Sequence, residues 1–416
     1  MSNNGTREDH GYDYVDDYFT LQLEKRAMRF LLEHGERKAA AEASGDERPP
    51  FFMMMGTPAA HANFIPPPQY FGGMNLTDRG VSMTAKAPRT PNWNTVCQHC
   101  HLPLRDYLPM TQEGQDESDD IWRRRLGTLA FVDDVVGTLW GQLAELDEDQ
   151  NTFFLYTADN GFHLGQWGQG FDKRQLYETD LRVPYFVRCP GCSSGVVLDE
   201  PVSHIDIAPT VLDFIGAPIP EYFDGRSFAP LLRGGGDYET AAATWDPRVF
   251  VQYFGESYMG GEFDFDQDPE DKPALFHTIG CGNGIDNTVA APGGPGAGST
   301  LSNTAYLLAP CDGWNNTYTC TRKVATKASP GGYMFCTFKC YEAVTMREIP
   351  CAADQPEGFG EYYDMVKDPW QMHNTAPSLT AAEKTELNAH VESMRHCAGQ
   401  GAPSEGGCVV EMVPRA

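Results

Sequence analysis

Apolar residues in the first part of the chain follow two different spacings, one helical and one continuous. A first helix is predicted by apolar side chains at every fourth position: Val15, Phe19, Leu23, Ala27 and Leu31. This helix is expected to end at Gly35, because glycine is common just past a helix terminus. The run FFMMMG, residues 51–56, lies between proline and glycine and predicts a buried parallel strand. The same two patterns recur as an amphipathic helix over residues 119–146 and a buried strand over residues 152–158.

Two further apolar runs and a short helical pattern continue this alternation. Strands are predicted over residues 182–188 and 248–254, with a helix between them over residues 204–217. Helices that alternate with apolar strands are typical of an α/β fold, with a mostly parallel sheet and helices on both faces. We therefore expect one α/β domain over residues 1–254.

The composition changes after residue 254, where acidic, glycine-rich and cysteine-rich segments follow one another. The segments TYTCTRKVA (317–325) and YMFCTFKCYEAV (333–344) predict short antiparallel strands, and a terminal helix is expected over residues 381–394. Residues 255–416 are therefore predicted to form a small, cysteine-rich α+β domain.

Charge and hydropathy exclude several kinds of partner. No run approaches the eighteen or so apolar residues that cross a bilayer, so no membrane span is expected. The net charge of −27 would repel nucleic acid and anionic membranes, so neither is expected as a partner. An anionic substrate requires a local pocket of the opposite sign.

Cysteine usage indicates the compartment. Most of the twelve cysteines lie after residue 280, which suggests disulfides and a secretory or lysosomal route. Structural thiols of a cytosolic protein are the alternative. The N-terminus, MSNNGTREDHGYDYVDDY, has no apolar h-region, so this chain is expected to carry no signal peptide.

Two short cysteine motifs could suggest a cofactor. CQHCH, residues 97–101, matches the pattern of haem attachment and could also suggest zinc, but no second Cys/His pair follows at zinc-finger spacing. A disulfide or a pair of loop thiols is therefore favoured. In CPGC, residues 189–192, a Pro-Gly turn at a strand end is favoured over a redox motif.

Four polar residues could form a metal and anion site. Asp159 and Asn160 follow the predicted strand 152–158 and offer two hard oxygen ligands for Ca²⁺ or Mg²⁺. Lys173 could hold an oxyanion, and His61, just after residues 51–56, could transfer a proton. A plain Asp-Asn-Gly turn between two strands is an equally good interpretation of these residues alone.

The stretch YTADNGFHLGQWGQGFDKRQLYETDLRVPYFVRCPG resembles the second signature region of the sulfatases, in the alkaline-phosphatase superfamily. Other segments are also similar to this family: PFFMMMGTPAAH, SHIDIAPTVLDFIGAPIPEYFDGRSFAPLL and GEYYDMVKDPWQMHN. The resemblance covers nearly the whole chain and is strongest to the N-acetylglucosamine-6-sulfatase branch.

This resemblance implies an enzyme that removes sulfate from a glycan sugar at a Ca²⁺ site, with a sulfated sugar or glycan as its partner. Asp159 and Asn160 match two calcium ligands, and Lys173 matches the lysine that binds the sulfate. His61 matches the histidine that protonates the leaving alcohol, although the family's Pro-His-Ser-Pro is here AAHANF. His163 lies inside the signature without an assigned role. The full-length protein is then expected to be lysosomal or secreted.

The chain departs from the family at the nucleophile. No cysteine stands in the Cys-x-(Pro/Ala)-x-Arg context that the family converts to formylglycine, and the early Asp-Asp metal pair is missing. The expectation is a sulfatase without its N-terminal part, with no nucleophile of its own. Such a fragment should fold poorly or aggregate, because its sheet would expose an edge. A catalytically inactive glycan-binding protein and a phosphohydrolase of the same superfamily remain alternatives.

Overall fold

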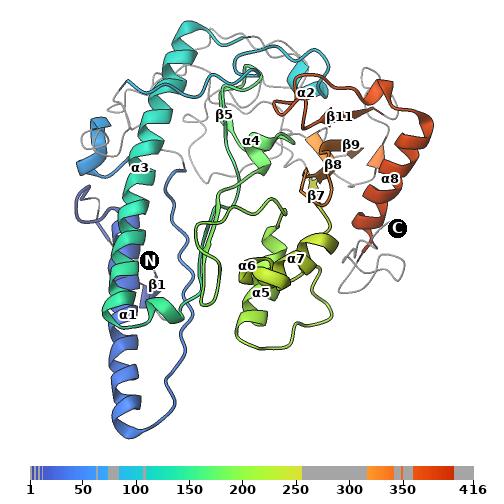
Figure 1. Ribbon diagram of the computed structural model, residues 1–416. Helices are drawn as coiled ribbons and strands as arrows, with labels where there is room; N and C mark the ends of the chain where they lie inside the picture. Colours follow the sequence, from blue (N-terminus) through green and yellow to red (C-terminus); the bar gives the residue numbers. More distant parts are fainter. Residues whose placement is uncertain are drawn as a thin grey trace. The chain divides into compact units, whose positions relative to one another are not determined.

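The computed structural model describes residues 2–3, 6–7, 10–11, 13–61, 64–73, 84–105, 109–254, 316–341, 348–349 and 359–397. The chain divides into two compact units (Figure 1). Unit 1 contains Met1–Pro88 and Gln115–Thr152, and unit 2 contains Arg89–Gly114 and Phe153–Ala416. Each unit has a hydrophobic cluster of its own.

Two long helices build unit 1: α1, Phe19–Ser44, and α3, Gln112–Glu145, of which all but the first residues lie in this unit. Their apolar faces share one buried cluster that includes Leu31, Val135 and Leu139. The shorter elements of this unit are β1 Ser2–Asn3, β2 Thr6–Arg7, η1 Pro68–Gly73 and η3 Asp149–Asn151.

The prediction that the first helix ends at Gly35 is wrong. Helix α1 continues to Ser44 and ends at Gly45, whose φ of 75° and ψ of 20° form a left-handed cap. Residues 36–44 are rich in Ala, Glu, Lys and Arg, which are good helix formers. A Cβ at position 35 would lie 2.5 Å from Cδ2 of Leu146. Glycine therefore allows close packing at this position and does not end the helix.

The prediction of a buried strand over residues 51–56 is also wrong. Within the described residues this segment pairs with no strand. Its alternate side chains pack against the unit 1 cluster: Phe51, Met53 and Met55. The side chains between them face solvent, with Phe52 74% and Met54 87% exposed. The continuous apolar run therefore has one buried and one exposed face.

The longer segment of unit 2, which starts at Phe153, first forms an antiparallel pair of β3 Phe154–Thr157 and β6 Tyr185–Arg188. Three short elements lie between them in sequence: β4 His163–Leu164, β5 Phe171–Asp172 and α4 Glu178–Leu181. Four helices follow β6: η4 His204–Asp206, α5 Ile207–Phe214, α6 Ala229–Arg233 and α7 Gly235–Thr244. Helix α2, Leu102–Arg105, precedes them in the chain.

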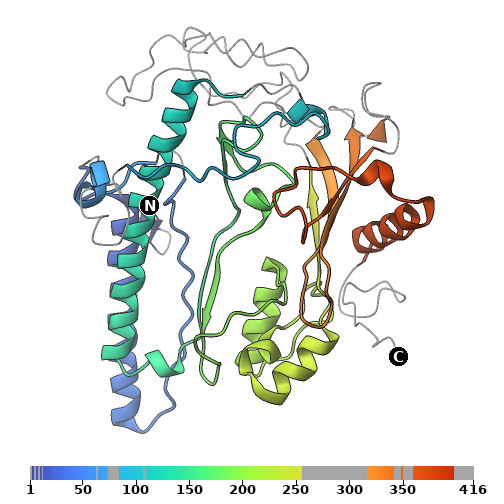
Figure 2. The same ribbon diagram turned by 45° about the horizontal axis from the view of Figure 1, so that its top comes forward.

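An antiparallel sheet, drawn from yellow to orange-red in Figure 2, forms the C-terminal part of unit 2. Its strand order is β10-β9-β8-β7, and β11 pairs with β9. Its strands are β7 Arg248–Tyr253, β8 Thr317–Lys323, β9 Tyr333–Tyr341, β10 Glu348–Ile349 and β11 Gly360–Asp364. A disulfide joins Cys320 and Cys336, which lie opposite each other on β8 and β9. Two helices follow: η7 Ala376–Ser378 and α8 Ala381–Arg395, the second with a capping box from Thr380 and Glu383.

The described strands do not reproduce the expected parallel sheet. Every strand pairing among the described residues is antiparallel, so the mostly parallel sheet is not confirmed there. Strand β7 precedes the expected boundary at residue 254, yet it pairs with β8 from the other side of that boundary. The domain division at residue 254 stays a prediction. No helix in the described ranges has the length and apolarity needed to span a membrane.

Candidate functional site

The turn after β3 presents two oxygen-bearing side chains. Asp159 is exposed and Asn160 is half-buried. The Asn160 backbone N–H donates to Asp159 Oδ1 at 3.0 Å, and the Asn160 Nδ2 donates to the Gly161 carbonyl at 2.6 Å. These bonds occupy the amide nitrogen of Asn160 and one carboxylate oxygen of Asp159. The other carboxylate oxygen and the Asn160 Oδ1 accept no hydrogen bond from the described residues.

Gly161 holds this turn against helix α4. Its N–H donates to the Asp180 carbonyl at 2.8 Å, and the next N–H, of Phe162, donates to the Thr179 carbonyl at 2.6 Å. A Cβ at position 161 would lie 2.1 Å from that Thr179 oxygen. Only glycine allows the two backbone segments to approach this closely.

A buried histidine–carboxylate pair lies directly behind the turn. His163 Nδ1 lies 2.9 Å from Asp180 Oδ2, and the side chain of Asp180 is fully buried. The same carboxylate oxygen accepts the Gln175 N–H at 2.7 Å. Asp180 therefore connects the segment after Asn160 to the segment after Lys173. His163 has no role that follows from its sequence position, and Asp180 is not among the predicted site residues, because its contacts with His163 and Gln175 depend on the fold.

Lys173 lies at the open end of the hairpin formed by β4 and β5. In this hairpin His163 is opposite Asp172, so Lys173 and the residues just after Asn160 emerge at the same end. The Lys173 N–H donates to Asp172 Oδ1 at 2.9 Å, and the Arg174 guanidinium pairs with the other oxygen of Asp172. The Lys173 ammonium itself has no ion-pair partner in the part of the chain that the structure describes.

His61 belongs to unit 1, so its expected role stays a prediction. It is exposed and lies in a turn, where its N–H donates to the Pro58 carbonyl at 2.9 Å. Arg125 of α3 fixes this turn by donating to the Ala60 carbonyl at 3.1 Å. Burial lowers the pKa of Arg125 to about 10, which leaves the guanidinium charged at neutral pH.

The donors present fit part of a hard-metal site. Among the described residues no three His, Cys, Asp or Glu side chains gather as a metal site. Asp159 and Asn160 supply a carboxylate and an amide oxygen, the donor types that Ca²⁺ prefers, whereas Ca²⁺ takes about six to eight ligands. This pair can therefore hold a metal only together with further oxygen ligands.

The CQHCH motif contains a disulfide, which is one of the two interpretations that its sequence favoured. Cys97 and Cys100 are bonded, and neither side chain is exposed. Cys189 and Cys192 of the CPGC motif are also bonded, just after β6. The two motifs therefore tie short loops within unit 2.

The chain matches the sequence model of the family described as Sulfatase over residues 2–217. It is 30% identical over 408 residues to the N-acetylglucosamine-6-sulfatase of Bos taurus, an alignment that covers 98% of this chain and 60% of that protein. The human protein of that name is also 30% identical, with 98% and 61% covered. The chain thus spans about three fifths of the length of these relatives. An extracellular sulfatase SULF-1 homolog of Drosophila melanogaster is 34% identical over 55% of this chain and 19% of its own.

One solved structure, of a protein in complex with its substrate D-glucosamine-2-N,6-O-disulfate, has a similar fold. It superposes with a TM-score of 0.54 at 20% identity and covers 91% of this chain and 69% of that chain. At this identity the likeness concerns the fold alone. The α/β class expected from the sequence agrees with this fold.

Proposed function

This chain belongs to the sulfatase family, and from that premise we propose that it acts in a glycan sulfatase that removes the 6-sulfate of N-acetylglucosamine. The observation that carries the proposal is the arrangement at the β4–β5 hairpin. There the half-buried Lys173, whose ammonium has no ion-pair partner in the described ranges, lies at the same end as the Asp159–Asn160 turn. Relatives named for this activity align over 98% of the chain.

Each predicted site residue has a chemical role in this proposal. Lys173 binds the sulfate group through charge and hydrogen bonds. Asp159 and Asn160 supply two of the oxygen ligands of a Ca²⁺ ion, which when bound would polarise the sulfate oxygens. His61 donates a proton to the departing sugar oxygen. No cysteine of this chain stands in the Cys-x-(Pro/Ala)-x-Arg context that the family uses as its nucleophile.

Three disulfides in which both cysteines are described support a secretory or lysosomal location. Cys97–Cys100, Cys189–Cys192 and Cys320–Cys336 are all closed. Disulfides persist in oxidising compartments and are rare in the cytosol. We therefore place the protein in a lysosome or outside the cell, with a sulfated sugar or glycan as its ligand.

Calorimetric titration tests this assignment without requiring turnover. The ligand is N-acetylglucosamine 6-sulfate in the presence of Ca²⁺, with unsulfated N-acetylglucosamine and its 6-phosphate as comparisons. We expect Lys173→Ala to lower the affinity for the sulfated sugar at least about tenfold, or ~1.4 kcal/mol of binding free energy. We expect Asp159→Ala to lower the affinity for Ca²⁺. Lys367→Ala is the matched control, since that side chain is 84% exposed and pairs with Asp364 in the C-terminal part of unit 2. Equal binding by Lys173→Ala and Lys367→Ala would contradict the proposal.

A glycan-binding protein without catalytic activity is the second candidate. It is favoured by the sequence, which contains no cysteine in the Cys-x-(Pro/Ala)-x-Arg context. It predicts the same Lys173-dependent binding, but no release of inorganic sulfate when the protein isolated from its native source is incubated for a long time with the sulfated sugar. Ion chromatography of the incubated mixture separates the two functions. Tighter binding of the 6-phosphate than of the 6-sulfate would favour a phosphohydrolase of the same superfamily.

A further inference from the structure

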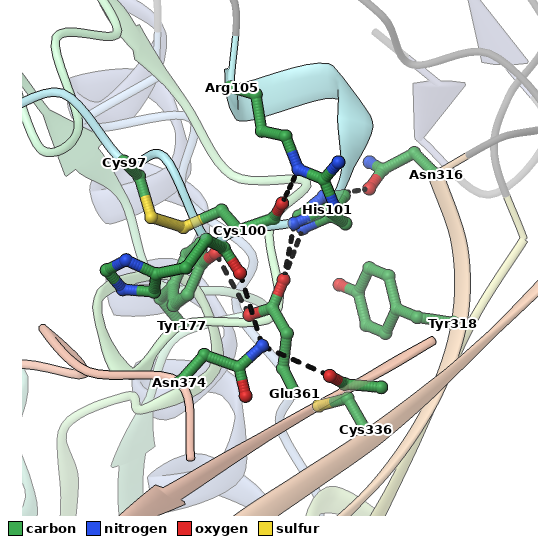
Figure 3. Close-up of polar contacts among 12 residues, drawn as sticks. Cys97, Cys100, His101, Arg105, Tyr177, Asn316, Tyr318, Cys336, Glu361 and Asn374 are labelled. Carbon is green, nitrogen blue, oxygen red and sulfur yellow. Dashed lines mark hydrogen bonds and ion pairs between the residues drawn. A yellow bond between two sulfur atoms is a disulfide. The ribbon is translucent and has the colours of Figure 1, made fainter. Parts of the chain in front are cut away.

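Five polar side chains outside the candidate site meet in the interior of unit 2, and we call them the buried hub: His101, Tyr177, Asn316, Glu361 and Tyr363. None of them is more than 2% exposed. Glu361 lies at the centre (Figure 3) and accepts the His101 N–H at 2.6 Å and His101 Nδ1 at 3.0 Å. It also accepts the hydroxyl groups of Tyr177 at 3.2 Å and Tyr363 at 2.6 Å.

The hydrogen bonds of the hub determine where its protons lie. Asn316 Nδ2 donates to the Arg174 carbonyl at 2.9 Å, so its Oδ1 faces His101 Nε2 at 3.2 Å. An amide oxygen can only accept, so Nε2 carries a proton. Nδ1 lies against the Glu361 carboxylate at 3.0 Å. Both ring nitrogens of His101 therefore face oxygen atoms of buried side chains.

The ionised form of Glu361 follows from the same contacts. Burial by itself would raise the pKa of Glu361, but the hydrogen bonds and the charge of His101 outweigh it and hold that pKa below its ordinary value. Buried ion pairs often give no more stability than apolar side chains of the same volume. The main contribution of this pair is therefore the geometry that it fixes.

What the hub fixes is the segment that follows Lys173. The Arg174 carbonyl receives the Asn316 amide at 2.9 Å and the Tyr318 hydroxyl at 3.4 Å. Three residues later the Tyr177 hydroxyl bonds to Glu361. The segment 174–177 is thus attached to the hub at both ends.

The disulfide between Cys97 and Cys100 stiffens the loop on the other side of the hub. It immediately precedes His101, whose backbone N–H and ring both bond to Glu361 (Figure 3). Arg105 donates to the Cys100 carbonyl and closes the next turn of the chain. The CQHCH motif therefore places an oriented imidazole ring in the interior of unit 2.

We propose that His101 and Glu361 are positioning residues for the sulfate-binding lysine, acting through Asn316 on the Arg174 carbonyl. The inference rests on the proposed function, since it takes Lys173 as the group that binds the sulfate. Neither hub residue touches the ligand. Their effect is to hold the backbone next to Lys173 in the conformation that presents its ammonium.

The test compares Asn316→Ala with Asn374→Ala in the full chain. Asn374 is a matched control, because its amide bonds to the His99 and Gly360 carbonyls near the hub and not to Arg174. Amide hydrogen exchange of residues 173–177, measured without ligand, should become at least tenfold faster in Asn316→Ala and stay unchanged in Asn374→Ala. Asn316→Asp is the second variant, since it keeps an acceptor for His101, replaces the donor to Arg174 by an oxygen and adds a carboxylate.

Titration with N-acetylglucosamine 6-sulfate and with Ca²⁺ completes the test. We expect Asn316→Ala to lower the affinity for the sugar at least tenfold and to leave the Ca²⁺ affinity unchanged. In a chain that already carries Lys173→Ala, the added Asn316→Ala should not lower the sugar affinity further. Unchanged exchange in both Asn316 variants would overturn the positioning role. Faster exchange with wild-type sugar affinity would overturn it as well. Faster exchange in a protein whose wild type binds no sulfated sugar would instead overturn the proposed function and leave the backbone link intact.

Discussion

At the scale of single residues, Gly161 is the position where the candidate site tolerates least change. An added Cβ would lie 2.1 Å from the Thr179 carbonyl oxygen, and neither backbone can move without disturbing the turn that carries Asp159 and Asn160. We expect Gly161→Ala to lower the free energy of unfolding by about 3 kcal/mol, the upper end for overpacked sites, and to weaken Ca²⁺ binding.

Urea denaturation and calorimetry measure these two effects. Gly137→Ala is the control, because position 137 is exposed on α3 and a Cβ there meets nothing within 4 Å. That substitution should raise stability by about 0.5–1 kcal/mol. Similar stabilities of Gly161→Ala and the parent chain would show that the close approach at position 161 is absent.

At the scale of elements, the contact between α8 and β7 carries a pH dependence. His390 of α8 lies beside Arg248 of β7, with 3.3 Å between His390 Nδ1 and Arg248 Nη1. Burial, and then the charge of Arg248, lower the pKa of His390 from 6.5 to about 4, while Asp246 acts in the opposite direction. The unfolded chain therefore binds this proton more tightly than the folded chain does, so stability is lost as pH falls from about 6.5 to about 4.

We expect His390→Gln to flatten the dependence of Tm on pH across that window. A series of thermal melts between pH 7 and pH 4 measures the slope. His396→Gln is the control, since its side chain is 77% exposed just after α8 and should leave the slope as it is. An unchanged slope in His390→Gln would mean that another group carries the acid sensitivity.

At the scale of the whole molecule, the exposed face of residues 51–56 should control solubility. Phe52 and Met54 are 74% and 87% exposed on an extended segment that has no strand partner in the described ranges. Extended apolar segments with unpaired backbone groups invite pairing between chains. We expect the double substitution Phe52→Ser and Met54→Ser to raise the monomer fraction in size-exclusion chromatography with little change in Tm. Phe51→Ser, on the face packed against the unit 1 cluster, should lower Tm instead.

Elements that depend on local spacing were predictable. Strands β3 and β7 and helix α8 lie where the apolar periodicity places them, and the absence of a second Cys/His pair after CQHCH favoured a disulfide or loop thiols, of which the structure has the disulfide. The Asp159–Asn160 turn also follows directly from its residues. Local sequence suffices in these cases because the deciding contacts are made between near neighbours in the chain.

Distant contacts decided the rest. Gly35 resembles a helix end until Leu146 is seen against it, and residues 51–56 resemble a buried strand until the exposed side chains of Phe52 and Met54 are seen.

By itself the sequence determined strands β3 and β7, helix α8 and the resemblance of the signature stretch to the sulfatases, because each depends on residues close together along the chain. Only the tertiary structure decided that Glu361 meets His101, which is 260 residues away, and that Asp180 joins the two halves of the candidate site. Such partners depend on which surfaces the chain buries against one another, and spacing along the sequence does not record that.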